Sequence, residues 1–168
     1  PWQALFPASS STFLFDSYSR TQIQKEMIHF QQAWEQKSFK IALDCLTKIL
    51  GLGIGLTPTG DDFITGLLAS FSALQQLPSK FQQLAVLAKE RTNAVSYAEI
   101  HEAVNERFSQ LVQRVFLSIE SGNTNEMAQA VSALEEVGST SGSDILCGII
   151  FGLKLFCEEN NHDNSNSN

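Results

Sequence analysis

TPTGDDFITGLL at residues 57–68 and STSGSDILCGII at residues 139–150 are two matching stretches that decide the fold of this 168-residue chain. They align without gaps as a hydroxyl residue, Gly, any residue, Asp, two apolar residues, one small residue, Gly and two apolar residues. The apolar part of each stretch continues into a segment typical of a buried helix. Gly66 and Gly148 lie one helical turn beyond the aspartate, so the two helices can cross with no side chain between them. The repeat therefore predicts a pseudo-symmetric pair of buried helices whose N-termini are directed at one place.

The first glycine of each stretch has two interpretations. Gly60 and Gly142 can adopt backbone angles closed to other residues, or they can let a ligand approach the chain closely. The first N–H groups of a helix have no partner within it and carry the positive end of its dipole, which favours an anion. Thr59 and Ser141 are candidate N-caps or ligand contacts. Duplication of a purely structural unit is the alternative, because Asp in a first turn is favoured by about 0.3–1 kcal/mol without any function.

The aspartates of the two stretches need a separate explanation, since carboxylates repel anions. They can brace the loops through backbone N–H groups, hold a divalent cation such as Mg²⁺, or act as a general acid or base if burial raises their pKa. We favour bracing for Asp61. Asp62 and Asp144, which align with each other, are the candidate catalytic residues and the candidate ligands of any metal.

A third polar segment at residues 91–96 contributes further candidates. Arg91 can supply a fork for a carboxylate or phosphate, or it can be an ordinary exposed arginine, and Ser96 is a candidate helix cap. Neither loop carries the lysine of a phosphate-binding P-loop or a complete G-x-G-x-x-G, which disfavours ATP and NAD. The residues expected to bind a small anion are Gly53, Gly55, Thr57, Thr59, Gly60, Asp61, Arg91, Ser96, Ser139, Thr140, Ser141 and Gly142.

Apolar residues at helical spacing occupy most of the remaining sequence. The expected helices begin at Arg20, at Phe39 and at residues 63, 80 and 96, then after Asn123 and after the second loop; the fifth covers 96–120 and the last ends near Cys157. The sequence thus predicts an all-α fold of about six or seven helices. We expect a helical domain at 20–157 and a disordered tail at 158–168. Residues 1–19 are expected to be loop, with a candidate strand at 12–15 left from a missing domain.

Composition excludes several classes of partner. The net charge of −7 argues against nucleic acid and against an anionic membrane surface. No apolar stretch reaches membrane-spanning length. The three cysteines are odd in number and lie in apolar stretches, so we expect reduced, buried thiols in a cytoplasmic protein. The chain begins at Pro1 rather than Met, which is typical of a fragment.

The runs from Gly51 to Gly66 and from Gly138 to Gly148 resemble the AllH-like family, named after the AllH subunit of oxamate carbamoyltransferase. Residues 91–96 resemble a third, weaker family segment of the type Arg-Thr-Thr-x-Ile-Ser, in which Asn93 replaces the second Thr here. The similarity extends over about residues 39–156. It implies phosphorolysis of oxalurate to oxamate and carbamoyl phosphate in purine (allantoin) catabolism, alongside other carbamoyltransferase subunits, and an N-terminal domain outside this chain.

Three functions stay open at this point. The chain can be a transferase subunit that binds phosphate, carbamoyl phosphate or oxamate between the two loops. It can be a Mg²⁺-dependent hydrolase that uses Asp62 and Asp144. It can also be a non-catalytic helical subunit that docks on a partner protein.

Overall fold

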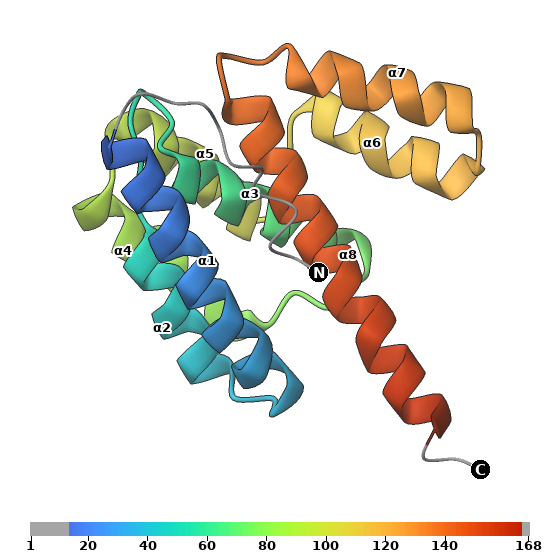
Figure 1. Cartoon of the computed structure of the whole chain (residues 1–168), viewed down its shortest axis with the longest axis horizontal. Helices are drawn as coiled ribbons and strands as arrows, with labels where there is room; N and C mark the ends of the chain where they lie inside the picture. The colour runs from blue at the N-terminus through green and yellow to red at the C-terminus, as the bar shows by residue number, and fades with distance from the viewer. Residues whose placement is uncertain (1–13, 166–168) are drawn as a thin grey trace.

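The computed structural model of the chain describes residues 14–165, and this part is all-α, as predicted. It contains eight α-helices and one short 3₁₀ helix, with no strand among the described residues (Figure 1). The elements are α1 (Leu14–Glu35), α2 (Phe39–Ile49), α3 (Thr59–Ala73), η2 (Ser79–Gln82), α4 (Gln83–Arg91), α5 (Ala94–Val104), α6 (Gln110–Ser121), α7 (Thr124–Glu135) and α8 (Ser141–Ser165).

Helices α3 and α8 are the predicted central pair, and they cross through their glycines. A Cβ atom added to Gly66 would lie 2.0 Å from the carbonyl oxygen of Ile145, and one added to Gly148 would lie 2.1 Å from that of Phe63. Since no side chain fits in either space, the two backbones can touch only because both positions are glycine. The predicted close crossing is confirmed. The contacts advance together along both chains, so the helices run in the same direction and begin at the same end of the molecule.

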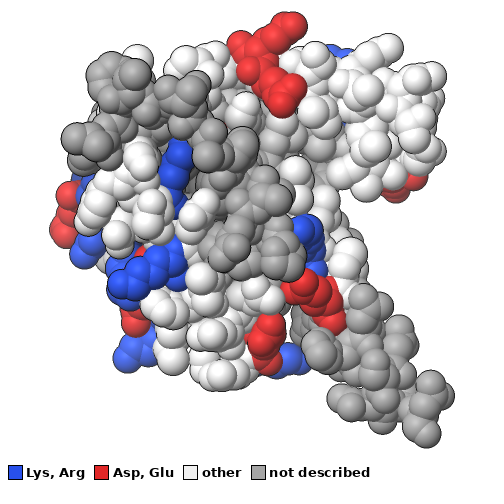
Figure 2. All heavy atoms as spheres, in the orientation of Figure 1, with Lys and Arg blue, Asp and Glu red and all other residues white. Residues whose placement is uncertain are grey.

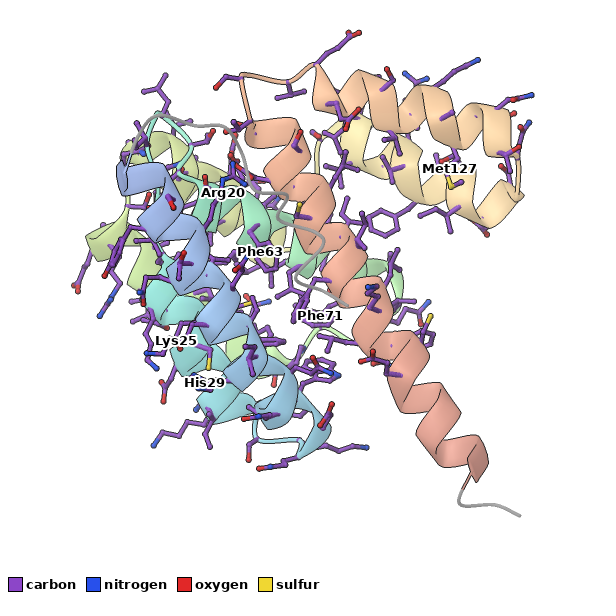
Figure 3. The ribbon with its side chains drawn as sticks, in the orientation of Figure 1. Arg20, Lys25, His29, Phe63, Phe71 and Met127 are labelled. Atoms are coloured by element: carbon purple, nitrogen blue, oxygen red, sulfur yellow. The ribbon has the colours of Figure 1, made fainter. Side chains whose placement is uncertain are left out.

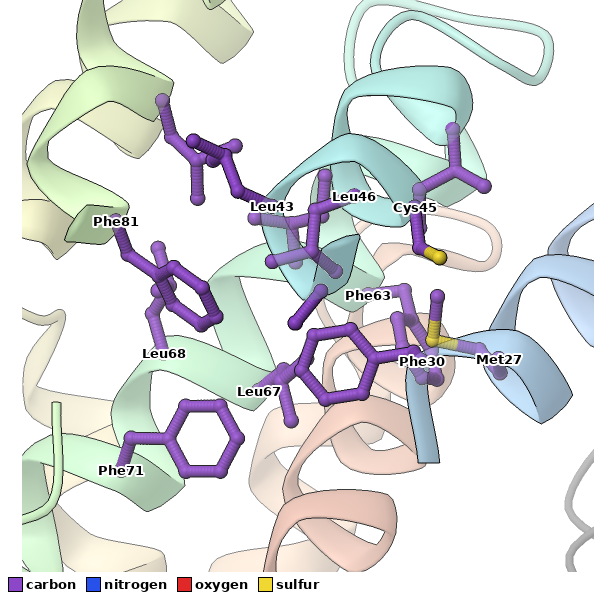
Figure 4. Close-up of a cluster of buried hydrophobic side chains, with 14 of the residues drawn as sticks. Met27, Phe30, Leu43, Cys45, Leu46, Phe63, Leu67, Leu68, Phe71 and Phe81 are labelled. Carbon is purple, nitrogen blue, oxygen red and sulfur yellow. The ribbon is translucent and has the colours of Figure 1, made fainter. Parts of the chain in front are cut away.

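Two apolar clusters surround this pair. One joins α1, α2 and α4 to α3, with Phe30, Leu46 and Phe71 among its side chains (Figure 4). The rings of Trp34 and Phe71 stack within it, with their centroids 4.3 Å apart. The other joins α6 and α7 to α8 through residues such as Val115, Leu134 and Ile149. The hairpin of α6 and α7 extends from the side of the molecule beside the first turns of α8 (Figure 1).

The single helix predicted over 96–120 is wrong. The chain breaks after Val104, with Glu106 in the left-handed region at φ 60°, and α6 starts again after Ser109. The Ser109 hydroxyl accepts a hydrogen bond of 3.3 Å from the Val112 N–H and so caps the new helix. The apolar period continues across the break, which explains why the pattern did not reveal it.

Both predicted end segments also need correction. Residues 12 and 13 of the candidate strand lie outside the described residues, and Leu14 and Phe15 begin α1. Short apolar runs fit either a strand or a helix, and here the helical continuation determines the outcome. Helix α8 does not end near Cys157 but continues to Ser165, through most of the predicted tail.

The cysteines follow the prediction only in part. All three are free, but Cys45 is buried, Cys147 is half-buried and Cys157 is exposed. Burial is the main cause that raises the pKa of the Cys45 and Cys147 thiols to about 11, which keeps both as unreactive thiols at neutral pH. Among the described residues, no helix is both long and apolar enough to traverse a bilayer.

Candidate functional site

The first loop returns the chain from the end of α2 to the start of α3. Gly51, Gly53 and Gly55 all have positive φ, of 73°, 138° and 110°, which residues with side chains rarely adopt. The N-cap of α3 is Pro58 rather than a hydroxyl residue, and its side chain provides no cap. Thr59 is buried as the first residue of the helix.

Asp61 braces this loop, as the sequence led us to expect. One carboxylate oxygen accepts a hydrogen bond of 2.7 Å from the Gly51 N–H, and the other accepts one from the Thr92 hydroxyl. Burial raises the pKa of Asp61, and the hydrogen bonds from Gly51 and Thr92, together with the nearby Ser96 hydroxyl, oppose that rise. Because both oxygens bind within the protein, Asp61 joins the ends of α2 and α4 to the start of α3.

The second loop is a tighter turn that leads into α8. Gly138 has φ 61°, Ser139 and Thr140 are exposed, and Ser141 is the first helical residue. Asp144, in the first turn, is 1% exposed.

Arg20 extends from α1 toward this first turn of α8 (Figure 3). One of its guanidinium nitrogens lies 3.4 Å from Asp144 Oδ1, and the Arg20 side chain is 16% exposed. Arg20 was not predicted as a site residue. Its only signal was a basic residue near the start of a helix, far from either loop in the sequence.

The two loops meet at their hydroxyl residues. Thr57 Oγ1 and Ser141 Oγ share a hydrogen bond of 2.6 Å, although they are far apart in the sequence. This contact brings together the two helix starts that carry Asp62 and Asp144. The expectation that both N-termini are directed at one place agrees with this contact.

Asp62 lies beside this contact and differs from the other aspartates. It is 1% exposed, and neither of its carboxyl oxygens accepts a hydrogen bond within the part of the chain that the structure describes. Burial is the main cause that raises the pKa of Asp62 to about 7. The nearby Ser141 and Thr57 hydroxyls lower this pKa, and the negative charges of Glu99 and Asp144 raise it. At neutral pH the Asp62 carboxyl therefore exists in both protonation states.

The backbone N–H groups are less available than the sequence suggested. In α3, the N–H of Gly60 donates to Leu52 O over 2.8 Å, and those of Asp61 and Asp62 donate to Pro58 O. In α8, the Gly142 and Asp144 N–H groups donate to Val137 O and Thr140 O. The Gly60 and Gly142 N–H groups thus donate to carbonyls outside their own helices, and those of Asp61, Asp62 and Asp144 donate to carbonyls at the helix starts. These bonds occupy N–H groups that an anion would otherwise use.

At Gly60 and Gly142 the missing side chain leaves room for another part of the chain. A Cβ atom at Gly60 would lie 2.0 Å from Ile49 O, and one at Gly142 would lie 1.8 Å from Leu134 O. A Cβ atom at Gly53 would similarly lie 2.4 Å from the Thr59 nitrogen. Gly55 is the exception, because nothing lies within 4 Å of its added Cβ.

The third polar segment supports the first loop. The helix cap is Asn93 rather than Ser96, since the Asn93 side chain accepts hydrogen bonds from the Val95 and Ser96 N–H groups. Asn93 Nδ2 also donates to Leu56 O over 2.8 Å, and the buried Ser96 hydroxyl donates to the same oxygen over 3.4 Å. Arg91 is exposed, and its guanidinium donates to Thr47 O over 3.3 Å.

The described side chains near the site do not form a group as large as those that usually bind a metal ion. Among the described residues, no group of three or more His, Cys, Asp or Glu side chains is placed to hold a metal ion. On the face shown in Figure 2, Lys and Arg are interspersed with Asp and Glu rather than gathered into one patch. The candidate site thus consists of Asp62, the hydroxyls of Thr57 and Ser141, and the ion pair of Asp144 with Arg20.

Comparison with known proteins identifies the family of the chain. No solved structure matches the chain. The model of the family described as oxamate carbamoyltransferase subunit AllH matches residues 49–153, a range that contains both loops and the whole of α3. The chain therefore belongs to the AllH family of oxamate carbamoyltransferase subunits.

Proposed function

We propose that this chain supplies a substrate-binding and proton-transferring site to an oxamate carbamoyltransferase. A small anion (phosphate, carbamoyl phosphate, or oxamate and oxalurate) would bind where the two loops meet. One observation carries the proposal: Asp62 is buried, neither of its oxygens is hydrogen bonded by a described residue, and it lies beside hydroxyls from both loops. Buried polar groups almost always have partners, so an exception of this kind suggests a ligand.

The anion would be held by side chains more than by backbone N–H groups. When Asp62 is protonated, its O–H can donate to the anion, as can whichever of the Thr57 and Ser141 hydroxyls does not donate in the bond between them. The positive ends of the α3 and α8 dipoles favour negative charge at the same place. Arg20 adds a cation near the start of α8, and Asp144 holds it there.

The proton chemistry of carbamoyl transfer suits such a carboxyl group. In phosphorolysis, a phosphate oxygen attacks the ureido carbonyl carbon of oxalurate, and the C–N bond to oxamate breaks. The leaving nitrogen then takes a proton, which Asp62 would donate. In the reverse direction Asp62 would accept that proton as the oxamate nitrogen attacks carbamoyl phosphate. A carboxyl group with a pKa of about 7 serves in both directions at neutral pH.

Replacement of the Asp62 carboxyl group tests the proposal directly. In the enzyme assembled with its partner subunits, Asp62→Asn should lower kcat by at least about a hundredfold, because the amide cannot exchange a proton. Circular dichroism should show unchanged helicity. Asp44→Asn is the matched control, since Asp44 is exposed on α2, and this variant should keep full activity. Full activity in Asp62→Asn would remove this residue from the mechanism.

A Mg²⁺-dependent hydrolase is the second candidate, and the proximity of two carboxylates favours it. The charge of Asp144 raises the pKa of Asp62, so a divalent cation between them would relieve their repulsion. Calorimetry with Mg²⁺ on the wild type and on Asp144→Ala separates the two functions. A heat of binding that Asp144→Ala abolishes would favour the hydrolase, and the absence of heat in both would exclude a metal at this pair.

A further inference from the structure

A cavity of about 370 Å³ lies between α3, α5, α6 and α8. Its walls are partly apolar, with Phe108, Val112 and Ile145, and partly polar, with Thr65, Glu99 and Arg107. Pockets that bind small molecules begin at about 300 Å³, so this volume suits a small substrate rather than a nucleotide.

The cavity adjoins the Asp62 site. Thr65 lies three residues after Asp62, and side chains at this spacing share a face of a helix. Ile145 directly follows Asp144 in α8. Glu99, in α5, is close enough for its charge to act on Asp62. A molecule in the cavity would therefore have one end next to the Asp62 carboxyl.

Two polar groups of the cavity are available to a ligand. The Thr65 hydroxyl oxygen is buried and makes no hydrogen bond with any described residue. The Arg107 guanidinium binds Glu102 through Nε and through Nη2, the latter over 2.9 Å to Oε1. These contacts use two of the five N–H donors of a guanidinium, and they hold its plane in a fixed orientation.

Building on the proposed function, we propose that this cavity binds the amide carboxylate of the reaction: oxamate, or the same end of oxalurate. Arg107 pairs with its carboxylate through N–H donors that Glu102 does not use. Thr65 hydrogen-bonds to the amide, and the apolar wall of Phe108, Val112 and Ile145 excludes water from the reacting end. The phosphate then binds on the other side of Asp62, at Thr57 and Ser141. The two substrates thus occupy separate places with the proton-transferring group between them.

Calorimetric titration of the assembled enzyme with oxamate, and separately with inorganic phosphate, tests this assignment. Arg107→Gln should weaken oxamate binding by about 10- to 100-fold, because a charge-assisted pair is lost, and should leave phosphate binding within about twofold of the wild type. Thr65→Val, which keeps the side-chain shape, should weaken oxamate binding by about fivefold to tenfold. Arg114→Gln is the matched control, since Arg114 is exposed on α6 and does not line this cavity, and it should change neither affinity.

The outcomes separate this assignment from the proposed function. Unchanged oxamate affinity in both Arg107→Gln and Thr65→Val, or an absence of oxamate binding in the wild type, would overturn the cavity assignment, whatever Asp62→Asn does to turnover. Lost oxamate affinity in Arg107→Gln would support it, even if Asp62→Asn kept full turnover and so contradicted the role of Asp62. An equal loss of phosphate and oxamate binding in Arg107→Gln would overturn it as well, because the two substrates would then share one site.

Discussion

The starts of α3 and α8 are nearly identical in sequence pattern and lie in contact through Thr57 and Ser141, yet they use their carboxylates differently. In α3, Asp61 accepts two hydrogen bonds, whereas the buried Asp62 accepts none from a described residue. In α8, the aligned Asp144 pairs with Arg20 from a third helix. The difference shows that a shared pattern need not mean a shared chemical role.

What the two regions do share is packing. Gly66 and Gly148 occupy equivalent positions of the repeat, and each leaves room for a carbonyl oxygen of the other helix. Gly60 and Gly142 are equivalent too, and each leaves room for the end of the preceding helix. The repeated glycines therefore serve the approach of backbones, while the aligned aspartates of the two stretches have different surroundings.

The largest expected effect comes from breaking this shared packing. Gly66→Val and Gly148→Val should each destabilise the protein by about 3 kcal/mol or more, because backbone atoms lie where the new side chain must go. Chemical denaturation measures the loss, and the two variants should suffer alike if the contacts are equivalent.

A glycine with free space around it gives the control for these variants. Gly122 has φ 67° and nothing within 4 Å of an added Cβ, so Gly122→Ala should cost only about 1 kcal/mol, from backbone strain. A loss as small as this in Gly66→Val or Gly148→Val would show that the α3–α8 crossing is looser than the structure implies.

A smaller effect, specific to α3, comes from the pH dependence of stability. Because burial raises the folded-state pKa of Asp62 from 3.8 to about 7, the folded state binds the extra proton between these values. This contribution to stability is complete below about pH 4, and it is lost as pH rises through 7. Asp62→Asn removes the dependence, so at pH 8 the variant should be more stable than the wild type by up to about 4 kcal/mol.

Urea unfolding from pH 4 to pH 8 checks this prediction. Asp61 and Glu99 also have raised pKa values, but they are present in both proteins, so the difference between wild type and variant isolates Asp62. Parallel stability curves for the two proteins would mean that Asp62 is ionised throughout. In that case it would be unsuited to proton donation.

Much of this fold was predictable because its determinants are local. The apolar periods and the matched glycines gave the all-α class, the buried helix pair and the close crossing at Gly66 and Gly148. The helix break after Val104 was missed, since its capping hydroxyl at Ser109 interrupts no apolar period. The early start of α1 was missed for a related reason: a four-residue run carries too little periodicity to distinguish strand from helix.

The site was predictable to a lesser degree, because side-chain partners depend on distant segments. The bracing role of Asp61 followed from the tendency of a first-turn aspartate to accept from a nearby loop N–H. The pairing of Asp144 with Arg20, and the capping of α5 by Asn93 in place of Ser96, involve choices among several polar residues that sequence spacing does not rank. The engagement of the first-turn N–H groups depends on how each loop folds back on its helix.

The smallest expected effect concerns the one bond that joins the two regions. Thr57→Val and Ser141→Ala each remove a partner of the 2.6 Å hydrogen bond, and each should cost about 1 kcal/mol in denaturation experiments. The double variant should cost less than the sum of the single variants, because the same bond is lost in all three. Since both hydroxyls lower the pKa of Asp62, its titration in the double variant should move above 7. Strictly additive costs with an unchanged titration would mean that the two loops are neighbours without being coupled, and that Asp62 does not depend on either hydroxyl.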